Sequence, residues 1–332
     1  MRPRILVTNW VHEATLQQLS LLGDVDDNES RAPWTREEVI RRAQRADAIL
    51  AFMTDRIDRE FLPNCRKLRI VACALKGYDN FDVAACNDAG VWVTIVPDLL
   101  TEPTAELAVG LAIGLARHIR EGDDVVRSGY FEGWRPVLYG TGLNDSTVSI
   151  VGMGEVGCAV AKRLGGFGCR LFGVDPQARM PPDVTGIPLQ RALETSDYVI
   201  LCLPLTPASG HLFGADAMAR MKRGAFLINV GRGSVVDEQA VANALEIGTL
   251  GGYAADVFEM EDWALPGRPA AIDPRLRTHR ATLFTPHLGS AVETVRRAIE
   301  MRAIDNIADA LGGRRPRDAI NQPRITAKAD AG

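Results

Sequence analysis

The chain has 332 residues, of which 46% are hydrophobic and 24% are charged, and its net charge is −4. This composition excludes a disordered chain, which would lack the apolar side chains for a core, and the length predicts two domains. Because 38 basic residues are balanced by 42 acidic ones, we expect no nucleic-acid partner, since phosphate backbones are bound by a basic excess.

The apolar segments are too short for a membrane span or a secretory signal. The longest uncharged stretch, Leu107–Ala116, has half of the roughly 20 residues that a span needs, and the run Ile5–Val7 is shorter than a signal's hydrophobic region. No two of the six cysteines have the two-residue gap of zinc or redox motifs. We therefore expect reduced thiols, no metal, no membrane association and a cytoplasmic location.

The first hundred or so residues predict a small unit in which strands and helices alternate. Short apolar runs predict strands, and one segment has helical spacing. The strands are expected at Arg4–Thr8, Asp47–Phe52, Leu68–Ala74 and Val91–Ile95, and the helix at His12–Leu22.

A longer helix is predicted at Ala105–Ile119. Thr101 can cap it, and Pro103 lies in the first turn, where its missing N–H is not needed. The helix is rich in Ala and Gly, which permit close packing inside a domain or across a dimer.

From Thr147 onward the alternation of strands and helices becomes regular. This pattern predicts a parallel, doubly wound α/β sheet. We expect a loose tail from about Arg324. The predicted strands are Thr147–Val151, Arg170–Val174, Tyr198–Leu203, Ala225–Val230, Gly252–Val257 and Thr282–Thr285.

A dinucleotide-binding motif follows the first of these strands. Gly152, Gly154 and Gly157 form a G-x-G-x-x-G that opens the helix Cys158–Leu164, and Asp175 ends the next strand 21 residues after Gly154. The glycines allow a tight turn and close approach of a pyrophosphate, and the carboxylate binds ribose hydroxyls. Asp175 favours NAD over NADP because it repels a 2′-phosphate, although the nearby Arg179 weakens this preference.

Three further predicted strands are followed by reactive side chains, where ligands of open α/β sheets bind. Arg232 can hold a small anion, His287 can exchange a proton near neutral pH, and Glu261 can orient the imidazole. Each residue taken alone could be structural: a single histidine is often a packing residue. The occurrence of all three residues after a dinucleotide motif favours an active site. The other histidines lack this context and are interpreted as surface or packing residues: His12, His118, His211 and His279.

These motifs resemble the D-2-hydroxyacid dehydrogenase family. The resemblance rests on Gly152–Gly157, Asn229–Asp237, Asp256–Glu261 and Thr285–Ser290. It implies two Rossmann-like parallel-sheet α/β domains, with an NAD domain at 101–288 inserted into a substrate domain at 1–100 and 289–332. It also implies a homodimer formed partly by the 101–120 helix, and Arg232, Glu261 and His287 as catalytic residues.

The same resemblance assigns the NAD contacts. They are expected from Thr104, Gly152, Gly154, Glu155, Val156, Gly157, Asp175, Leu203, Pro204, Val230, Gly231, Arg232, Asp256, His287, Gly289 and Ser290.

Other segments resemble the phosphite (phosphonate) dehydrogenases of that family. They are Ala51–Met53, Ala74–Asp82, Val96–Leu100, Gly133-Trp134 with Tyr139–Gly142, and Asp256–Trp263. The resemblance implies that Lys76, Gly77 and Arg232 bind substrate with His287, that Met53 and Tyr139 line the pocket, that Trp134 covers it and that Arg296 adds positive potential. A second cation beside Arg232 suits a compact dianion, although a loop lysine can also be merely solvated.

The leading hypothesis is therefore NAD-dependent oxidation of phosphite to phosphate. A first alternative is a dehydrogenase of a small 2-hydroxy or 2-oxo acid, which does not need Lys76. A second alternative is a nucleotide-sensing regulator without enzymatic activity, which the complete set of Arg232, Glu261 and His287 disfavours.

Overall fold

The computed structural model describes residues 2–323, so the tail predicted from Arg324 lies outside the described residues. The chain divides into two compact units. Unit 1 contains the residues up to Leu100, Trp263–Pro266 and those from Val292 onward, and unit 2 contains Thr101–Asp262 and Gly267–Ala291. The return to unit 1 thus occurs at Val292 rather than at the predicted 289, and a short segment beginning at Trp263 also belongs to unit 1.

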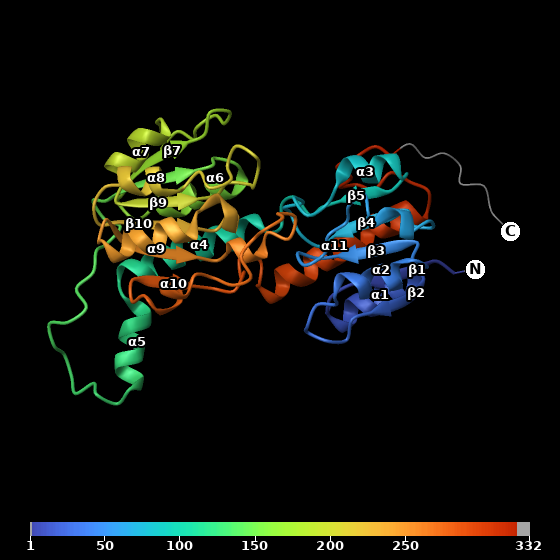
Figure 1. The fold of residues 1–332 in the computed structure, drawn as a ribbon, viewed down its shortest axis with the longest axis horizontal. Helices are drawn as coiled ribbons and strands as arrows, with labels where there is room; N and C mark the ends of the chain where they lie inside the picture. The colour runs from blue at the N-terminus through green and yellow to red at the C-terminus, as the bar shows by residue number, and fades with distance from the viewer. Residues whose placement is uncertain (1, 324–332) are drawn as a thin grey trace. The chain divides into compact units, whose positions relative to one another are not determined.

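Unit 1 is built around a five-stranded parallel sheet with the order β2-β1-β3-β4-β5. Helix α11 comes from the end of the chain yet packs on α1, β3 and β4, and Figure 1 shows it in orange-red beside the blue strands. The elements of unit 1 are β1 (Arg4–Val7), α1 (Glu13–Leu22), β2 (Asp24–Asp27), α2 (Arg36–Ala43), β3 (Ala48–Ala51), η1 (Leu62–Asn64), β4 (Ile70–Cys73), α3 (Val83–Asp88), β5 (Trp92–Thr94) and α11 (Glu293–Leu311).

Strand β2 was not predicted. Its sequence, Asp-Val-Asp-Asp, is acidic, which is unfavourable for a strand. It forms at the edge of the sheet, where it pairs with β1 and its side chains are exposed or half-buried. Edge strands tolerate charged side chains, so pairing with β1 overrides the local preference.

Unit 2 contains a seven-stranded parallel sheet with the order β12-β11-β10-β9-β6-β7-β8. The two parallel sheets confirm the predicted α/β fold class, and the order around β6 is that of a dinucleotide-binding fold. The elements are α4 (Thr101–Ala116), α5 (Ile119–Arg127), β6 (Thr147–Val151), α6 (Glu155–Leu164), β7 (Arg170–Val174), β8 (Thr185–Gly186), α7 (Leu189–Thr195), β9 (Tyr198–Leu201), α8 (Ala215–Arg220), β10 (Ala225–Asn229), η2 (Gly233–Val235), α9 (Glu238–Glu246), β11 (Leu250–Ala255), η3 (Glu259–Glu261), α10 (Pro274–Thr278) and β12 (Thr282–Phe284).

Helix α4 begins and ends earlier than predicted. Thr101 is its first residue rather than its cap, and the helix ends at Ala116. His118 then adopts a left-handed conformation with φ of 52°, which separates α4 from α5. The small residues of α4 were expected to allow close packing either inside a domain or across a dimer. The structure shows packing inside a domain, since α4 packs on α6 and β11 within unit 2.

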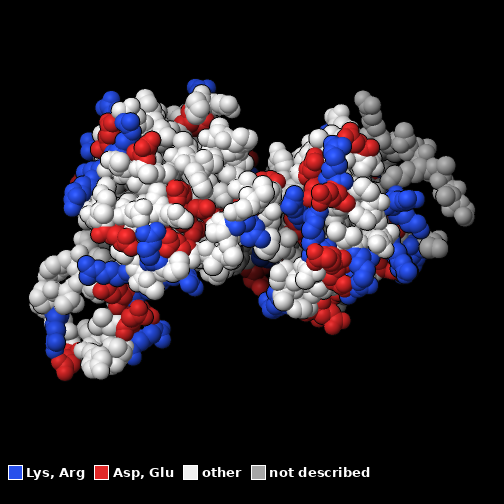
Figure 2. Space-filling view, viewed as in Figure 1, with Lys and Arg blue, Asp and Glu red and all other residues white. Residues whose placement is uncertain are grey.

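Both sheets are covered by apolar side chains that form the cores of the units. On the face drawn in Figure 2, acidic and basic side chains are interspersed. No helix within residues 2–323 is both long and apolar enough to cross a membrane. The six cysteines carry no disulfides; three are buried and three half-buried, and burial raises the pKa of Cys65, Cys86 and Cys202 to about 12.

Candidate functional site

The glycine turn between β6 and α6 is tightly packed at two of its three glycines. Gly152 has φ of +92°, and a Cβ there would lie 2.8 Å from the carbonyl oxygen of Cys202. A Cβ on Gly157 would lie 2.0 Å from the carbonyl oxygen of Gly152. At Gly154, by contrast, a Cβ would meet nothing within 4 Å. Gly152 and Gly157 are therefore required by the close packing of the backbone around them. Gly154 instead leaves open space in front of the turn.

That open space lies at the first turn of α6, where Glu155 and Val156 follow Gly154. The free amides at a helix start and the helix dipole both favour a bound anion. The turn therefore fits the pyrophosphate of a dinucleotide, as the motif predicts.

Asp175 lies at the end of β7 and is held by the same turn. Its Oδ1 accepts hydrogen bonds from the amides of Gln177 at 2.9 Å and Ala178 at 3.1 Å, and its Oδ2 accepts from Met153 N at 3.0 Å. The Gln177 amide is the main cause that lowers the pKa of Asp175. The group is thus an ionised acceptor beside the glycine turn, suited to ribose hydroxyls.

The other predicted NAD residues of unit 2 follow the carboxyl ends of neighbouring strands. Because all strands are parallel, these ends lie at one edge of the sheet. Leu203 and Pro204 follow β9, Val230 and Gly231 follow β10, and Gly289 and Ser290 follow β12. A Cβ on Gly289 would lie 3.0 Å from Thr104 Oγ1 and 3.2 Å from Asp256 Oδ2, so these three predicted residues are neighbours.

His287 and Glu261 form a direct pair. Nδ1 of His287 lies 2.6 Å from Oε2 of Glu261, and Glu261 Oε1 accepts a hydrogen bond from Phe258 N at 3.0 Å. An ionised carboxylate can only accept, so Nδ1 carries the proton and Nε2 is left to exchange protons. Both side chains are about 30% exposed (30% and 28%), which leaves them accessible to a substrate.

The backbone of His287 is held in an uncommon conformation, with φ of 57°. Its amide donates to the carbonyl oxygen of Asp256 at 2.9 Å. The Asp256 carboxylate accepts from Thr285 Oγ1 at 2.6 Å, Leu288 N at 2.6 Å and Gly289 N at 2.8 Å. Burial raises the pKa of Asp256, and the bond from Thr285 opposes that shift. Sequence comparison assigned Asp256 to the cofactor; the structure adds that it fixes the histidine loop.

Arg232 directly follows the turn after β10 and occupies the residue position just before η2. Its side chain is half-buried, and one guanidinium nitrogen donates to the carbonyl oxygen of Gly231 at 3.0 Å. Asn229 Nδ2 donates to the carbonyl oxygen of Arg232 at 2.9 Å. Since β10, β11 and β12 are neighbours in the sheet, unit 2 brings Arg232, Glu261 and His287 to the same edge, as predicted.

Three further predicted substrate residues lie in unit 1. Met53 follows β3, and Lys76 and Gly77 follow the adjacent strand β4; all three are half-buried. Asn80 Nδ2 donates to the carbonyl oxygen of Met53 at 2.8 Å, which joins the two loops.

Arg296, on α11, lies beside these same loops. It donates to the carbonyl oxygen of Ala74 at 3.3 Å, and its guanidinium lies 5.9 Å from the centroid of the Phe52 ring. Unit 1 thus collects two cations, Lys76 and Arg296, near the carboxyl edge of its sheet.

Trp134 and Tyr139, which the resemblance places at the substrate pocket, are exposed in this chain. They are on a segment without helix or strand and are 83% and 78% exposed. The described residues therefore do not enclose either ring in a pocket. The physical reason is local: the segment around residues 128–142 has little of its own chain to pack against, as Figure 1 shows in green beyond α5.

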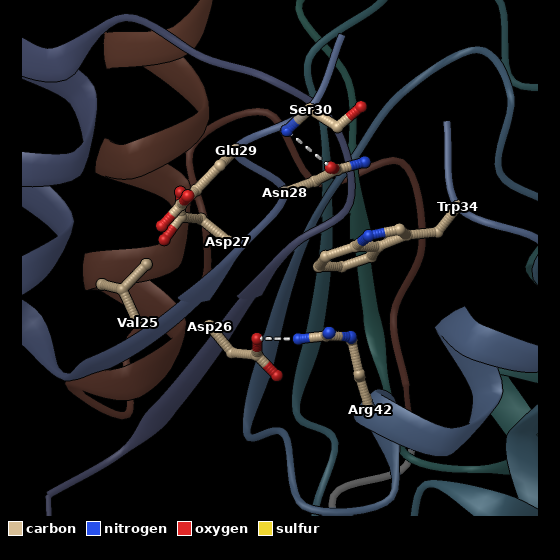
Figure 3. A pocket seen from close by; sticks show the side chains of 8 residues that line it. All are labelled: Val25, Asp26, Asp27, Asn28, Glu29, Ser30, Trp34 and Arg42. Carbon is tan, nitrogen blue, oxygen red and sulfur yellow. Dashed lines mark hydrogen bonds and ion pairs between the residues drawn. The ribbon is translucent and has the colours of Figure 1, made fainter. Parts of the chain in front are cut away.

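A cavity of about 460 Å³ lies elsewhere, beside the edge strand β2 (Figure 3). Within it Arg42 pairs with Asp26 and lies 4.2 Å from the centroid of the Trp34 ring. None of the predicted site residues lines it, so we do not assign it to the function. Its lining residues are Val25, Asp26, Asp27, Asn28, Glu29, Ser30, Trp34 and Arg42.

Comparison with known proteins identifies the family. The family model described as "D-isomer specific 2-hydroxyacid dehydrogenase, NAD binding domain" matches residues 109–289. A glyoxylate reductase of Korarchaeum cryptofilum is 37% identical over 97% of this chain and 97% of its own length. The chain belongs to the D-isomer specific 2-hydroxyacid dehydrogenase family. It is an NAD(P)-dependent oxidoreductase of this family and contains the family's NAD-binding domain.

Solved structures support the same membership in the D-isomer specific 2-hydroxyacid dehydrogenases. The TT0316 protein from Thermus thermophilus superposes with a TM-score of 0.87 and 34% identity, covering 96% of this chain and 99% of that one. A glyoxylate reductase from Paecilomyes thermophila gives a TM-score of 0.83 and 25% identity, covering 96% and 98%. The relatives named glyoxylate reductase support the 2-hydroxyacid alternative better than phosphite oxidation.

Proposed function

We propose that this dehydrogenase oxidises phosphite to phosphate. Water adds its oxygen to phosphorus, hydride leaves phosphorus for NAD, and one proton is released. The pairing of His287 with Glu261 at 2.6 Å carries the proposal that the site performs this acid–base chemistry. Lys76, at the carboxyl end of β4, supports phosphite as the substrate, because it supplies a second cation for a dianion.

His287 acts as the base. Its Nδ1–H donates to Glu261, so Nε2 takes the proton from the attacking water. The Glu261 carboxylate then stabilises the imidazolium that forms. A positioned base contributes about 10²–10⁴-fold to the rate.

The substrate's oxygens are held by cations. Arg232 offers a forked set of donors, and Lys76 adds a compact charge. Arg296, beside the Lys76 loop, raises the local positive potential. Fixed charges of this kind stabilise the negative charge that builds up as water attacks.

NAD supplies the hydride acceptor when it is bound. The residues that would hold it are the glycine turn at 152–157, Asp175 and the strand-end residues near Thr104 and Asp256. We propose preference for NAD over NADP because the ionised Asp175 repels a 2′-phosphate.

Reduction of a small 2-oxo acid such as glyoxylate is the second candidate. The relatives named glyoxylate reductase favour it, and the same residues can perform it. Arg232 would hold the carboxylate, and His287 would donate its proton to the keto oxygen. Of the two candidates, this one has the better support among the named relatives, whereas the residues around Lys76 favour phosphite.

One assay distinguishes the candidates. We expect NADH to form, measured by its absorbance, when the protein is mixed with NAD and phosphite. We expect little turnover with D-lactate or D-glycerate, and slow NADH consumption with glyoxylate. Faster turnover of glyoxylate than of phosphite would establish 2-oxo acid reduction instead. If the protein turns over none of these substrates, the result would favour a nucleotide-sensing regulator without enzymatic activity.

We also propose that the protein forms a homodimer and that it is located in the cytoplasm. The segment from α5 to Tyr139 exposes apolar side chains, among them Val126 at 56%, Tyr130 at 84% and Phe131 at 55%. Exposed apolar surface of this kind marks a protein contact. Sedimentation at micromolar concentration should give twice the 36.0 kDa chain mass, and Tyr130→Ser with Phe131→Ser should yield monomer.

A further inference from the structure

Two short turns of unit 2 lie directly against each other: η2, which follows Arg232, and η3, which ends at Glu261. A Cβ on Gly233 would lie 1.9 Å from the carbonyl carbon of Phe258 and 2.4 Å from Glu259 N. The two backbones are therefore in contact, and only glycine fits between them.

A buried carboxylate fastens this contact. Asp262 Oδ2 accepts a hydrogen bond from Ser234 N at 2.7 Å, and both residues are 3% exposed. Asp262 directly follows Glu261, and Ser234 lies two residues after Arg232. One hydrogen bond thus joins the turn that carries the anion-binding residue to the turn that carries the carboxylate paired with the base.

A second pair of bonds joins η3 to the start of α9, which follows η2 in the chain. Glu238 N donates to Glu259 Oε1 at 2.8 Å, and Glu259 N donates to Glu238 Oε1 at 3.0 Å. This pair lies on the far side of η2 from Arg232. Of these hydrogen bonds, the one to Asp262 is therefore the nearest in sequence to Arg232 and Glu261.

We propose that Asp262 is a positioning residue that sets where Arg232 stands relative to the Glu261–His287 pair. The inference rests on the proposed function and names a residue whose role sequence comparison did not assign. Because Glu261 is bonded to His287 at 2.6 Å, a shift of η3 reaches the imidazole directly. Without the carboxylate, the Ser234 amide loses its buried acceptor and η2 moves from η3.

Steady-state kinetics test this role. We expect Asp262→Ala to lower kcat/KM for phosphite about 10–100-fold, the effect of losing one hydrogen bond to a charged group, while the Kd for NAD changes little. Asp262→Asn keeps an oxygen that can accept from Ser234 N, so it should remain within about threefold of wild type. An asparagine variant as impaired as the alanine variant would contradict the hydrogen-bond role.

Asp197→Ala is the matched control. Asp197 also accepts a backbone amide, Thr147 N at 2.9 Å, but at the start of β6, the opposite edge of the sheet from the site. This variant should lose stability and keep its kcat/KM for phosphite. A decrease in kcat/KM equal to that of Asp262→Ala would reduce the role of Asp262 to stability alone.

A second measurement does not depend on turnover. The Nδ1–H proton of His287, held by Glu261, should give a downfield proton NMR resonance in wild type, Asp262→Asn and Asp197→Ala. We expect Asp262→Ala to lose it; if that variant does not fold, Asp262→Ser, whose shorter side chain no longer supplies the carboxylate to the Ser234 amide, tests the same displacement. A retained resonance overturns the positioning role. If wild type turns over no substrate but the resonance behaves as expected, the proposed function fails and the positioning role stands.

Discussion

Asp256 holds the backbone of His287 in place. The His287 amide donates to the Asp256 carbonyl oxygen at 2.9 Å, and the Asp256 carboxylate accepts from the next two amides at 2.6 and 2.8 Å. The left-handed conformation of a non-glycine residue costs about 1–3 kcal/mol, so it persists only where surrounding contacts enforce it. This loop therefore presents the imidazole to Glu261 before any substrate binds.

Replacing the base should abolish the reaction. We expect His287→Ala to lower kcat by at least about 10²-fold, the contribution of a positioned base, while calorimetry still detects NAD binding. Glu261→Gln should retain part of the activity and show a changed pH profile, because the imidazolium loses its carboxylate partner. Wild-type rates in His287→Ala would exclude this mechanism.

Lys76 decides between the two substrate candidates. We expect Lys76→Ala to raise the KM for phosphite about 10–100-fold, because a hydrogen bond to a charged group is lost. The Kd for NAD should change little, since Lys76 belongs to unit 1. Lys67→Ala, also in unit 1, is the control for loss of a positive charge. Unchanged phosphite kinetics in Lys76→Ala would favour the 2-oxo acid.

Two glycines of the same turn should respond differently to alanine. Gly154→Ala adds a Cβ that meets nothing within 4 Å, so the melting temperature should stay close to wild type while NAD binding weakens. Gly157→Ala places its Cβ 2.0 Å from a backbone oxygen, so the fold itself should be destabilised. Scanning calorimetry and NAD titration of both variants separate the effects. Unaltered NAD affinity in Gly154→Ala would mean that the pyrophosphate binds elsewhere.

The cofactor preference should depend on Asp175. Removal of its charge in Asp175→Ala should narrow the ratio of kcat/KM with NAD to that with NADP, because repulsion of the 2′-phosphate disappears. Asp183→Ala, elsewhere in unit 2, is the charge control. If wild type uses both cofactors equally and neither variant alters the ratio, Asp175 does not contact the ribose.

Asp55 makes the stability of the protein depend on pH. Its Oδ2 accepts from Thr8 Oγ1 at 2.5 Å and Phe52 N at 2.7 Å, and burial raises its pKa to about 6. An unfolded carboxyl titrates near 3.8, so between these values the folded protein binds the additional proton. The free energy of unfolding should therefore fall by roughly 3 kcal/mol over the whole titration, and by roughly 2 kcal/mol of this as pH rises from about 4 to about 6.

Asp55→Asn should lack this decrease, because the amide does not titrate. Urea unfolding of both proteins across this pH range measures the difference, which should grow with pH in favour of the variant. A constant difference would show that Asp55 titrates alike in the folded and unfolded states.

The sequence by itself determined the elements that build the site. The glycine motif, Asp175 and the runs ending at Arg232, Glu261 and His287 are local patterns, and a parallel sheet brings the ends of its strands to one edge. Strands β6 and β7 were predicted with their observed bounds. The resemblance to the D-2-hydroxyacid dehydrogenases rested on these same segments, and the family comparison confirmed it.

Only the tertiary structure decided how these residues are held. The acidic segment of β2 forms a strand because it pairs with β1. The local sequence preference does not indicate this pairing. The roles of Asp256 and Asp262 depend on amides more than 25 residues away in the chain. The exposure of Trp134 depends on which other parts of the protein pack against its segment. Sequence periodicity reports which side of an element is buried, whereas hydrogen bonds between distant loops form only after the strands have paired.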